Sequence, residues 1–366
     1  DDRFVEIHTH SKIDYTREFI ITVFDQSGDV YAQAYQYYNP RTKIVSLDAV
    51  FYDQNGREIK KFKTRDFEDQ SAVSGGQTYT DRRVKFLRYN PTEYPYTLHY
   101  KVKVNHADYS YPTSWFPIQA SNVAIENASF TLKNNTAASM QISEKNFEHF
   151  PIQKQNTAQQ ISYTLKHQKA LEDEQMMPFY RDVFPHAESN ISEFVLDGVA
   201  GKFNDWNGLG IWYNQLISNV NDFTPKEKQY FKDMVKDAES DREKVKILYK
   251  HLQNKTRYIG VQLGIGGLKP FPSSYVESKS YGDCKALTNY MQSMLEAVGI
   301  KSYYTIVESG RDGYNFDEKF ASLGQGDHVI LYVPLAEEDI WLEATSQTTA
   351  FNYLGHFTHD RKVAIV

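Results

Sequence analysis

The chain has 366 residues, of which 40% are hydrophobic and 14% aromatic, and its formal net charge is −6. This length indicates two or three domains with a sizeable hydrophobic core, and the 27 Tyr and 22 Phe favour β-strands over a helical bundle. The negative net charge argues against a dedicated nucleic-acid-binding protein, which normally carries a basic face.

The first half of the chain has the pattern of β-strands. Segments rich in β-branched and aromatic residues, with partial alternation of apolar and polar positions, occur at 17–24, 45–52, 97–104 and 123–132. Asp-Gln-Ser-Gly and Asp-Gln-Asn-Gly turns follow two of them. No strong helical period occurs before residue 165. We therefore predict an antiparallel β-sandwich over residues 1–165.

The pattern changes twice after this domain. Residues 166–200 contain prolines and acidic residues without a sustained period, and we interpret this segment as a connector that runs along the surface. Residues 201–366 combine helical and strand-like patterns, so the whole chain is predicted to be of the α+β class. The chain stops in a strand pattern, RKVAIV, and we expect the natural protein to continue into a further C-terminal domain.

Helices and strands alternate in the second half. Helices are predicted at 205–220 and 241–257, and the second has Ser240 as N-cap. Its apolar stripe consists of Val245, Leu248 and Leu252. Strands are predicted at 302–307, at 328–333, at 340–343 and in the final RKVAIV.

A helix that begins at the only cysteine lies between these elements, in YGDCKALTNYMQSML. Gly282 ends the preceding element and Asp283 caps the first turn, and from Leu287 onward the apolar residues recur at helical spacing. One cysteine excludes an internal disulfide, and two interpretations of Cys284 remain open. It either fills the core, as free cysteines often do, or it is a nucleophile, because a helix start favours the thiolate.

A base and an acid occur downstream on a predicted hairpin. His328 begins the strand GDHVILYVP, and Glu343 lies in IWLEATS beyond the polar turn PLAEED. One turn register places His328 opposite Glu343, and the other places it opposite Thr345 with Glu343 diagonal to it. Both put the acid on the face of the histidine, within reach of it, whereas Asp327 points to the opposite face. Cys284, His328 and Glu343 thus supply the nucleophile, base and orienting acid of acyl transfer.

The sequence from about Asp205 to the end resembles the transglutaminase-like fold, a relative of papain. The resemblance rests on KTRYIGVQLGIGGLKPFPSSYVESKSYGDCK, on GDHVIL and on IWLEATS. It implies a helix that bears the nucleophile Cys284, packed on an antiparallel sheet that bears the base His328 and the third member Glu343. The first half resembles a β-rich domain of unknown function that often precedes this core in secreted bacterial proteins.

Two positions depart from the family pattern. Most members carry Asp where this chain has Glu343, a side chain one methylene longer, and many carry an acid where it has Ala286. The backbone N–H of Cys284 is the expected oxyanion donor. Gln262 in GVQLG is a candidate for a second donor, and the alternative for Gln262 is a strand residue that faces solvent.

These features predict thiol-dependent acyl transfer on amide bonds, most simply the hydrolysis of a peptide through a thioester intermediate. The alternative is a catalytically inactive module of the same fold that binds or scaffolds, which the departure at Glu343 and the large β-domain motivate. We expect no cofactor and no metal, because GIGGLKP lacks the Gly-Lys-Ser/Thr of a phosphate loop and no calcium loop is evident.

We predict a peptide or protein substrate as the partner, and we predict that the chain does not bind nucleic acid. No run of 18 apolar residues occurs, so we expect no membrane span in this chain. The resemblance implies a periplasmic or extracellular bacterial protein. The sequence opens with Asp-Asp and has no apolar stretch after it, so a signal peptide was either absent or removed.

Overall fold

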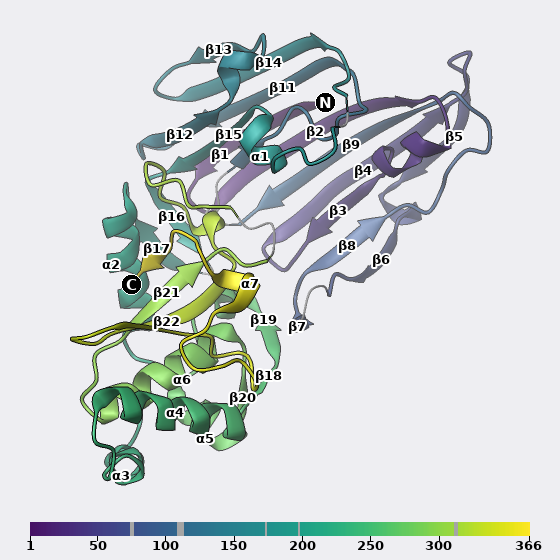
Figure 1. Cartoon of the computed structure of the whole chain (residues 1–366). Helices are drawn as coiled ribbons and strands as arrows, with labels where there is room; N and C mark the ends of the chain where they lie inside the picture. The colour runs from purple at the N-terminus through teal and green to yellow at the C-terminus, as the bar shows by residue number, and fades with distance from the viewer. Residues whose placement is uncertain (74–76, 108–112, 173, 197, 311–313) are drawn as a thin grey trace. The chain divides into compact units, whose positions relative to one another are not determined.

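The computed structural model describes residues 1–73, 77–107, 113–172, 174–196, 198–310 and 314–366 (Figure 1). The chain forms two compact units. The first comprises Asp1–Val73 and Asp81–Gly201, and the second comprises Ser74–Thr80 and Lys202–Val366. The chain is of mixed α+β class, because the first unit consists mainly of strands and most helices lie in the second.

An eight-stranded sheet dominates the first unit (Figure 1). Its order is β13-β14-β11-β1-β2-β9-β4-β5. The bounds are β1 (Asp2–Thr9), β2 (Lys12–Val23), β4 (Thr42–Tyr52), β5 (Glu58–Lys63), β9 (Tyr96–His106), β11 (Ile125–Asn134), β13 (Gln153–Asn156) and β14 (Gln160–Gln168). Strand β9 buries every second residue from Tyr96 to Val104, because alternate side chains of a strand point to opposite faces.

Two three-stranded sheets accompany the large sheet. They are β10 (Thr113–Trp115), β15 (His186–Ile191) and β12 (Met140–Lys145), and β3 (Tyr35–Tyr38), β8 (Arg83–Phe86) and β6 (Glu68–Ser71). The first packs against the apolar face of the large sheet, where Trp115 stacks on Tyr163 with ring centroids 5.4 Å apart. Ala187 and Ile191 of β15 join the same hydrophobic core. Packing of sheet on sheet therefore buries the apolar faces in this unit.

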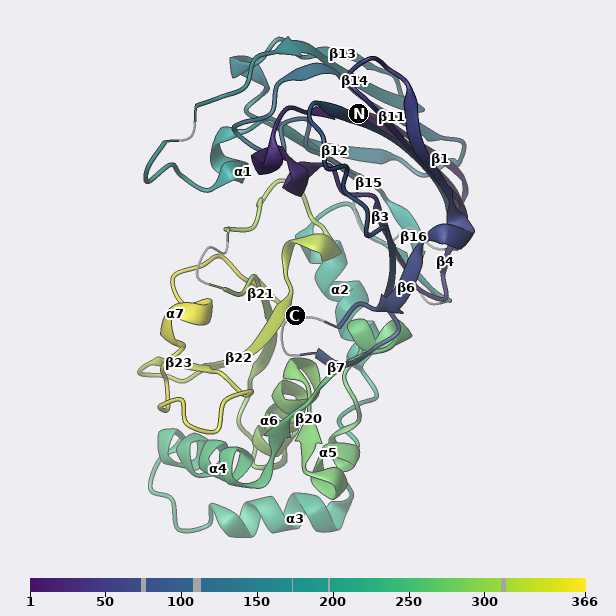
Figure 2. The ribbon, with the colours of Figure 1, turned by 90° about the vertical axis from the view of Figure 1, so that its right-hand side faces the viewer.

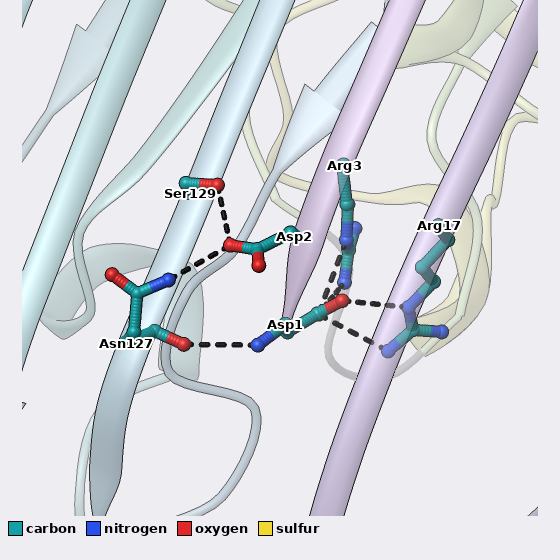
Figure 3. Close-up of polar contacts among 6 residues, drawn as sticks. All are labelled: Asp1, Asp2, Arg3, Arg17, Asn127 and Ser129. Carbon is teal, nitrogen blue, oxygen red and sulfur yellow. Dashed lines mark hydrogen bonds and ion pairs between the residues drawn. The ribbon is translucent and has the colours of Figure 1, made fainter. Parts of the chain in front are cut away.

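One strand pairing corrects the predicted antiparallel arrangement. Strand β1 runs parallel to β11, with Asp2 opposite Ser129. Figure 3 shows that the Asp2 carboxylate accepts a hydrogen bond from the Ser129 hydroxyl, while the Asp1 carboxylate binds the guanidinium groups of Arg3 and Arg17. The alternation of side chains is the same in parallel and antiparallel strands, so the sequence pattern cannot specify direction between strands that are far apart in the chain.

The segment predicted to be a surface connector contains a buried strand, which is a second correction. Strand β15 lies between β10 and β12, and Ile191 is completely buried. Its sequence, HAESNI, is mostly polar, and some of these side chains have partners inside the unit; Ser189, for example, donates to the backbone oxygen of Thr113 at 3.1 Å. The other elements near β15 in the sequence are α1 (Tyr180–Val183), β16 (Glu193–Leu196) and β17 (Val199–Lys202).

The helices of the second unit confirm both of the helices predicted at 205–220 and 241–257. They are α2 (Trp206–Ile217), α3 (Pro225–Met234), α4 (Asp241–Lys255), α5 (Ser273–Lys279), α6 (Cys284–Ala297) and α7 (Gly355–Thr358). Ser240 caps α4 by accepting from the backbone N–H of Glu243 at 3.2 Å. Helix α3 was not predicted, although Thr224 and Glu227 form a capping box at its start.

A four-stranded antiparallel sheet supports the helix that begins at the cysteine. Its order is β23-β22-β21-β24. The bounds are β21 (Tyr303–Val307), β22 (His328–Pro334), β23 (Asp339–Leu342) and β24 (Ala364–Ile365). Helix α6 packs against β22 and also contacts α3, α4 and α5 (Figures 1 and 2). It is therefore the central element of this core, and nearly all of its side chains are buried.

Short parallel pairs complete the second unit. Strand β18 (Arg257–Tyr258) pairs with β20 (Tyr281–Gly282), and β19 (Gly260–Gln262) pairs with β7 (Gln77–Thr80). Strand β7 comes from the first half of the sequence, so the second unit includes a segment outside the predicted range 201–366. Among the residues that the structure describes, no helix has the length and apolar character needed to cross a membrane.

Candidate active site

Cys284 is the first residue of α6, and the residues before it fix where this helix begins. Asp283 is the N-cap, and its Oδ1 accepts a hydrogen bond from the backbone N–H of Ala286 at 3.0 Å. Position 282 requires glycine, because a Cβ there would lie 2.8 Å from the Cβ of Ala286. Only 4% of Cys284 is exposed. Its thiol thus lies in the interior at a helix end whose N–H groups favour negative charge.

His328 and Glu343 form a buried pair. His328 is the first residue of β22 and Glu343 directly follows β23. The His328 Nε2 lies 2.9 Å from the Glu343 Oε2, and the two side chains are 8% and 5% exposed. Leu331 pairs with Leu342, and this register, continued, places His328 opposite Thr345. The second of the two predicted registers is therefore the one that the chain adopts, with Glu343 diagonal to His328.

Further contacts hold Glu343 in place. Its Oε1 accepts from the backbone N–H of Thr345 at 3.0 Å and from the Thr345 hydroxyl at 2.6 Å. The Tyr249 hydroxyl donates to the backbone oxygen of Glu343 at 2.9 Å. Burial alone would raise the pKa of Glu343, but the hydrogen bonds from His328 and Thr345 lower it below its usual value. The carboxylate therefore stays ionised, and the longer side chain does reach the imidazole.

The pKa of His328 depends on Cys284 as well as on Glu343. Burial lowers the pKa of His328, but its interactions with the side chains of Cys284 and Glu343 outweigh burial and raise it to about 10. Because Nε2 is bound to Glu343, Nδ1 is the ring nitrogen left for the thiol. A histidine that is protonated at neutral pH beside a thiol is the arrangement that stabilises a thiolate.

Two half-exposed aromatic residues that were not predicted from the sequence interact with His328 and Cys284. Phe357 of α7 packs edge-on against the imidazole of His328, with ring centroids 5.2 Å apart, and its backbone oxygen accepts from the N–H of Gly310. Burial raises the pKa of Tyr258 to about 12, helped by its electrostatic interactions with Cys284 and Asp283. No hydrogen-bond partner of the Tyr258 hydroxyl occurs in the part of the chain that the structure describes. The only sequence signal for Tyr258 was its place in KTRYIGV.

For Gln262, the other predicted site residue, the role of oxyanion donor stays a prediction. Gln262 ends β19, and its Oε1 lies beside Gly267. Within the described ranges, no hydrogen bond joins Gln262 to Cys284 or His328. Asp327, the weaker acid candidate, is bound to the N–H and hydroxyl of Ser309. No cluster of three or more His, Cys, Asp or Glu residues suited to a metal ion occurs among the residues with described positions.

Comparisons with known proteins concern the first half of the chain and the fold as a whole. A family model described as a domain of unknown function with solved structure, DUF3857, matches residues 10–172, in line with the resemblance of the first half to such a domain. A search of curated proteins gives no match.

The fold is similar to that of a solved structure, a putative protease from Parabacteroides distasonis ATCC 8503. The TM-score is 0.67 and the sequence identity 15%, and the match covers 94% of this chain and 66% of that chain. This chain thus spans about two thirds of the length of that protein. A putative cysteine protease from Cytophaga hutchinsonii also matches, with a TM-score of 0.28, 11% identity and coverage of 95% and 80%. The first comparison shows a shared fold, and the second is too distant to support an argument.

Proposed function

We propose that this protein is a cysteine hydrolase of the transglutaminase-like, papain-related type, which cleaves amide bonds in peptides. The observation that carries the proposal is the buried His328–Glu343 pair beside the helix-start thiol of Cys284. The similar fold of a protein described as a putative protease supports it. In this proposal Cys284 is the nucleophile, His328 the acid and base, and Glu343 the residue that orients the imidazole.

The chemistry proceeds in two steps. The Cys284 thiolate attacks the amide carbonyl and forms a C–S bond, and the C–N bond then breaks while the amine leaves with the proton of the His328 imidazolium. Neutral His328 next takes a proton from water, which attacks the thioester, and the C–S bond breaks to release the acid and regenerate the thiolate and the imidazolium. The backbone N–H of Cys284 and the Tyr258 hydroxyl are the proposed oxyanion donors.

The test is the rate at which iodoacetamide alkylates Cys284 as a function of pH, followed by mass spectrometry. We expect fast alkylation at pH 6 in the native protein and loss of this acidic limb in His328→Ala. His149→Ala is the matched control, because the side chain of His149 is 70% exposed and pairs only with its neighbour Glu148 in the described residues. A native thiol that is slow at every pH below 8 would show that the ion pair does not form.

The second candidate, an inactive binding or scaffolding module, predicts that slow outcome in all three proteins. Its main motivation was the departure at Glu343, and the hydrogen bond to His328 weakens that argument. A periplasmic or extracellular location belongs to the proposal through the family resemblance, and cell fractionation of the natural host tests it.

A further inference from the structure

A buried ion pair flanks the nucleophile on both sides in the sequence. The Nζ of Lys285 lies 2.5 Å from the Oδ2 of Asp283, and the two side chains are 4% and 3% exposed. Lys and Asp are rarely buried this far unless they are paired. The other carboxylate oxygen of Asp283 is the helix cap described above. Both ions therefore lie in the interior within one residue of Cys284.

Asp283 is needed as the helix cap, but its negative charge disfavours a thiolate at Cys284, and Lys285 offsets that charge. Helix α6 needs an acceptor at its N-cap, and Asp283 supplies one as a buried carboxylate. A buried negative charge beside a thiol opposes formation of a second negative charge, the thiolate, because like charges repel strongly where water is excluded. The ammonium of Lys285 cancels the charge of Asp283 and leaves the cap intact.

We propose that Lys285 is a positioning residue that neutralises Asp283 and thereby sets the pH at which the Cys284 thiolate forms. This inference rests on the proposed function, since it concerns the same thiolate. Lys285 acts through Asp283 and does not touch the substrate.

Other titratable groups on neighbouring elements also face Cys284 and Asp283, but none of them neutralises Asp283 in place of Lys285. His328 from β22 is already bound to Glu343, which follows β23. Tyr258 from β18 and Tyr304 from β21 interact electrostatically with Cys284 and Asp283, and burial raises the pKa of both phenols, so both are neutral at neutral pH. Asp327, which interacts with Tyr258, adds a further negative charge.

The experiment measures how the rate of Cys284 alkylation by iodoacetamide depends on pH in four variants of the full chain. It compares the pH at which each curve reaches its midpoint. Lys285→Met leaves Asp283 charged, and its midpoint is expected to move up by about one pH unit. Asp283→Asn leaves the lysine charged and keeps the cap, because Asn caps as well as Asp, so its midpoint is expected to move down by about as much. The double variant returns to the native midpoint, and Lys285→Arg, which keeps the charge, stays near it.

Opposite shifts in the two single variants support the inference, since a purely structural disturbance would move both in the same direction. If Lys285→Met does not fold, the comparison of Asp283→Asn with the double variant decides, because these two differ only at position 285: a higher midpoint in the double variant supports the role of Lys285, and an equal one overturns it. An unmoved midpoint, or shifts of the same sign, overturns the role of Lys285 while the proposed function stands. A native protein that has no acidic limb overturns both proposals.

Discussion

Replacing Glu343 by Gln is expected to keep the fold and abolish the proposed thiolate–imidazolium pair. The amide retains an oxygen for the two donors of Thr345, but it presents an N–H to the Nε2 of His328. Nε2 must then accept, which moves the ring proton to Nδ1, the nitrogen left for Cys284. A neutral ring with its proton there cannot take the proton of the thiol. In Ser–His–Asp triads the same replacement of acid by amide lowers kcat by about 10⁴.

The magnitude follows from the charge states at pH 6. Burial lowers the pKa of His328, and without Glu343 much of what raises that pKa to about 10 is gone. A free thiol has a pKa of about 8.5 and is about 0.3% ionised at pH 6, so an ion-paired thiolate offers up to about 300-fold more of the reactive form. The lower nucleophilicity of a stabilised thiolate offsets about tenfold of this gain. Glu343→Gln is therefore expected to lower the iodoacetamide rate at pH 6 by about 10- to 30-fold.

Glu343→Asp is the companion variant because it keeps the charge and shortens the reach. Removing one methylene withdraws the carboxylate by about 1.5 Å, which takes the 2.9 Å hydrogen bond beyond the roughly 3.5 Å limit of a real one. We expect a similar loss of rate at pH 6, with circular dichroism confirming that both variants fold. If folded Glu343→Gln reacts within a factor of two of the native protein, Glu343 does not orient the base and the reasoning is refuted.

Three further predictions follow from the same geometry. Tyr258→Phe should lower the cleavage of any peptide that the native protein hydrolyses by about 10²-fold, with the iodoacetamide rate nearly constant, because alkylation forms no oxyanion; equal losses in both assays would contradict a donor role. Gly282→Ala should destabilise the protein by about 1–3 kcal/mol, measured by urea unfolding, because its Cβ meets that of Ala286. The pKa of His328 is raised on folding, so its contribution to stability is complete below about pH 6.5 and is lost as pH rises towards 10. The pKa of Glu343 is lowered on folding, so its contribution is complete above about pH 4.5 and is lost as pH falls below that. The difference in urea midpoint between the native protein and His328→Ala should therefore be largest between about pH 4.5 and 6.5. A difference that does not change with pH would contradict the His328–Glu343 ion pair.

The start of α6 and the contact between His328 and Glu343 could be predicted because local rules govern both. A glycine, an acidic cap and helical spacing after Cys284 specify where a helix begins. A hairpin of known approximate length puts His328 and Glu343 on one face in either register, because the two registers differ by two residues and only a slip of one residue changes the face. Phe357 and Tyr258 could not be predicted in the same way, since their contacts with the site depend on how separate elements pack.

The first half shows where alternation of side chains stops being informative. It identified strands, but it did not give the parallel direction of β1 and β11, and it missed β15, whose backbone pairs with β10 and β12, strands that are distant in the sequence. The place of β7 beside β19 is likewise a long-range pairing between residues about 180 positions apart in the sequence. No local pattern encodes such a contact.

The register of the hairpin and the presence of Glu at position 343 explain each other. Directly opposite residues on paired strands have Cβ atoms about 4.5–5.5 Å apart, whereas diagonal neighbours lie about 7–8 Å apart. His328 is opposite Thr345 in the register that the chain adopts, so its acid must span the diagonal. The extra methylene of Glu343 covers that greater distance, and the two Thr345 donors fix the far oxygen of the carboxylate. The length of Glu at position 343 thus suits the register that this chain adopts.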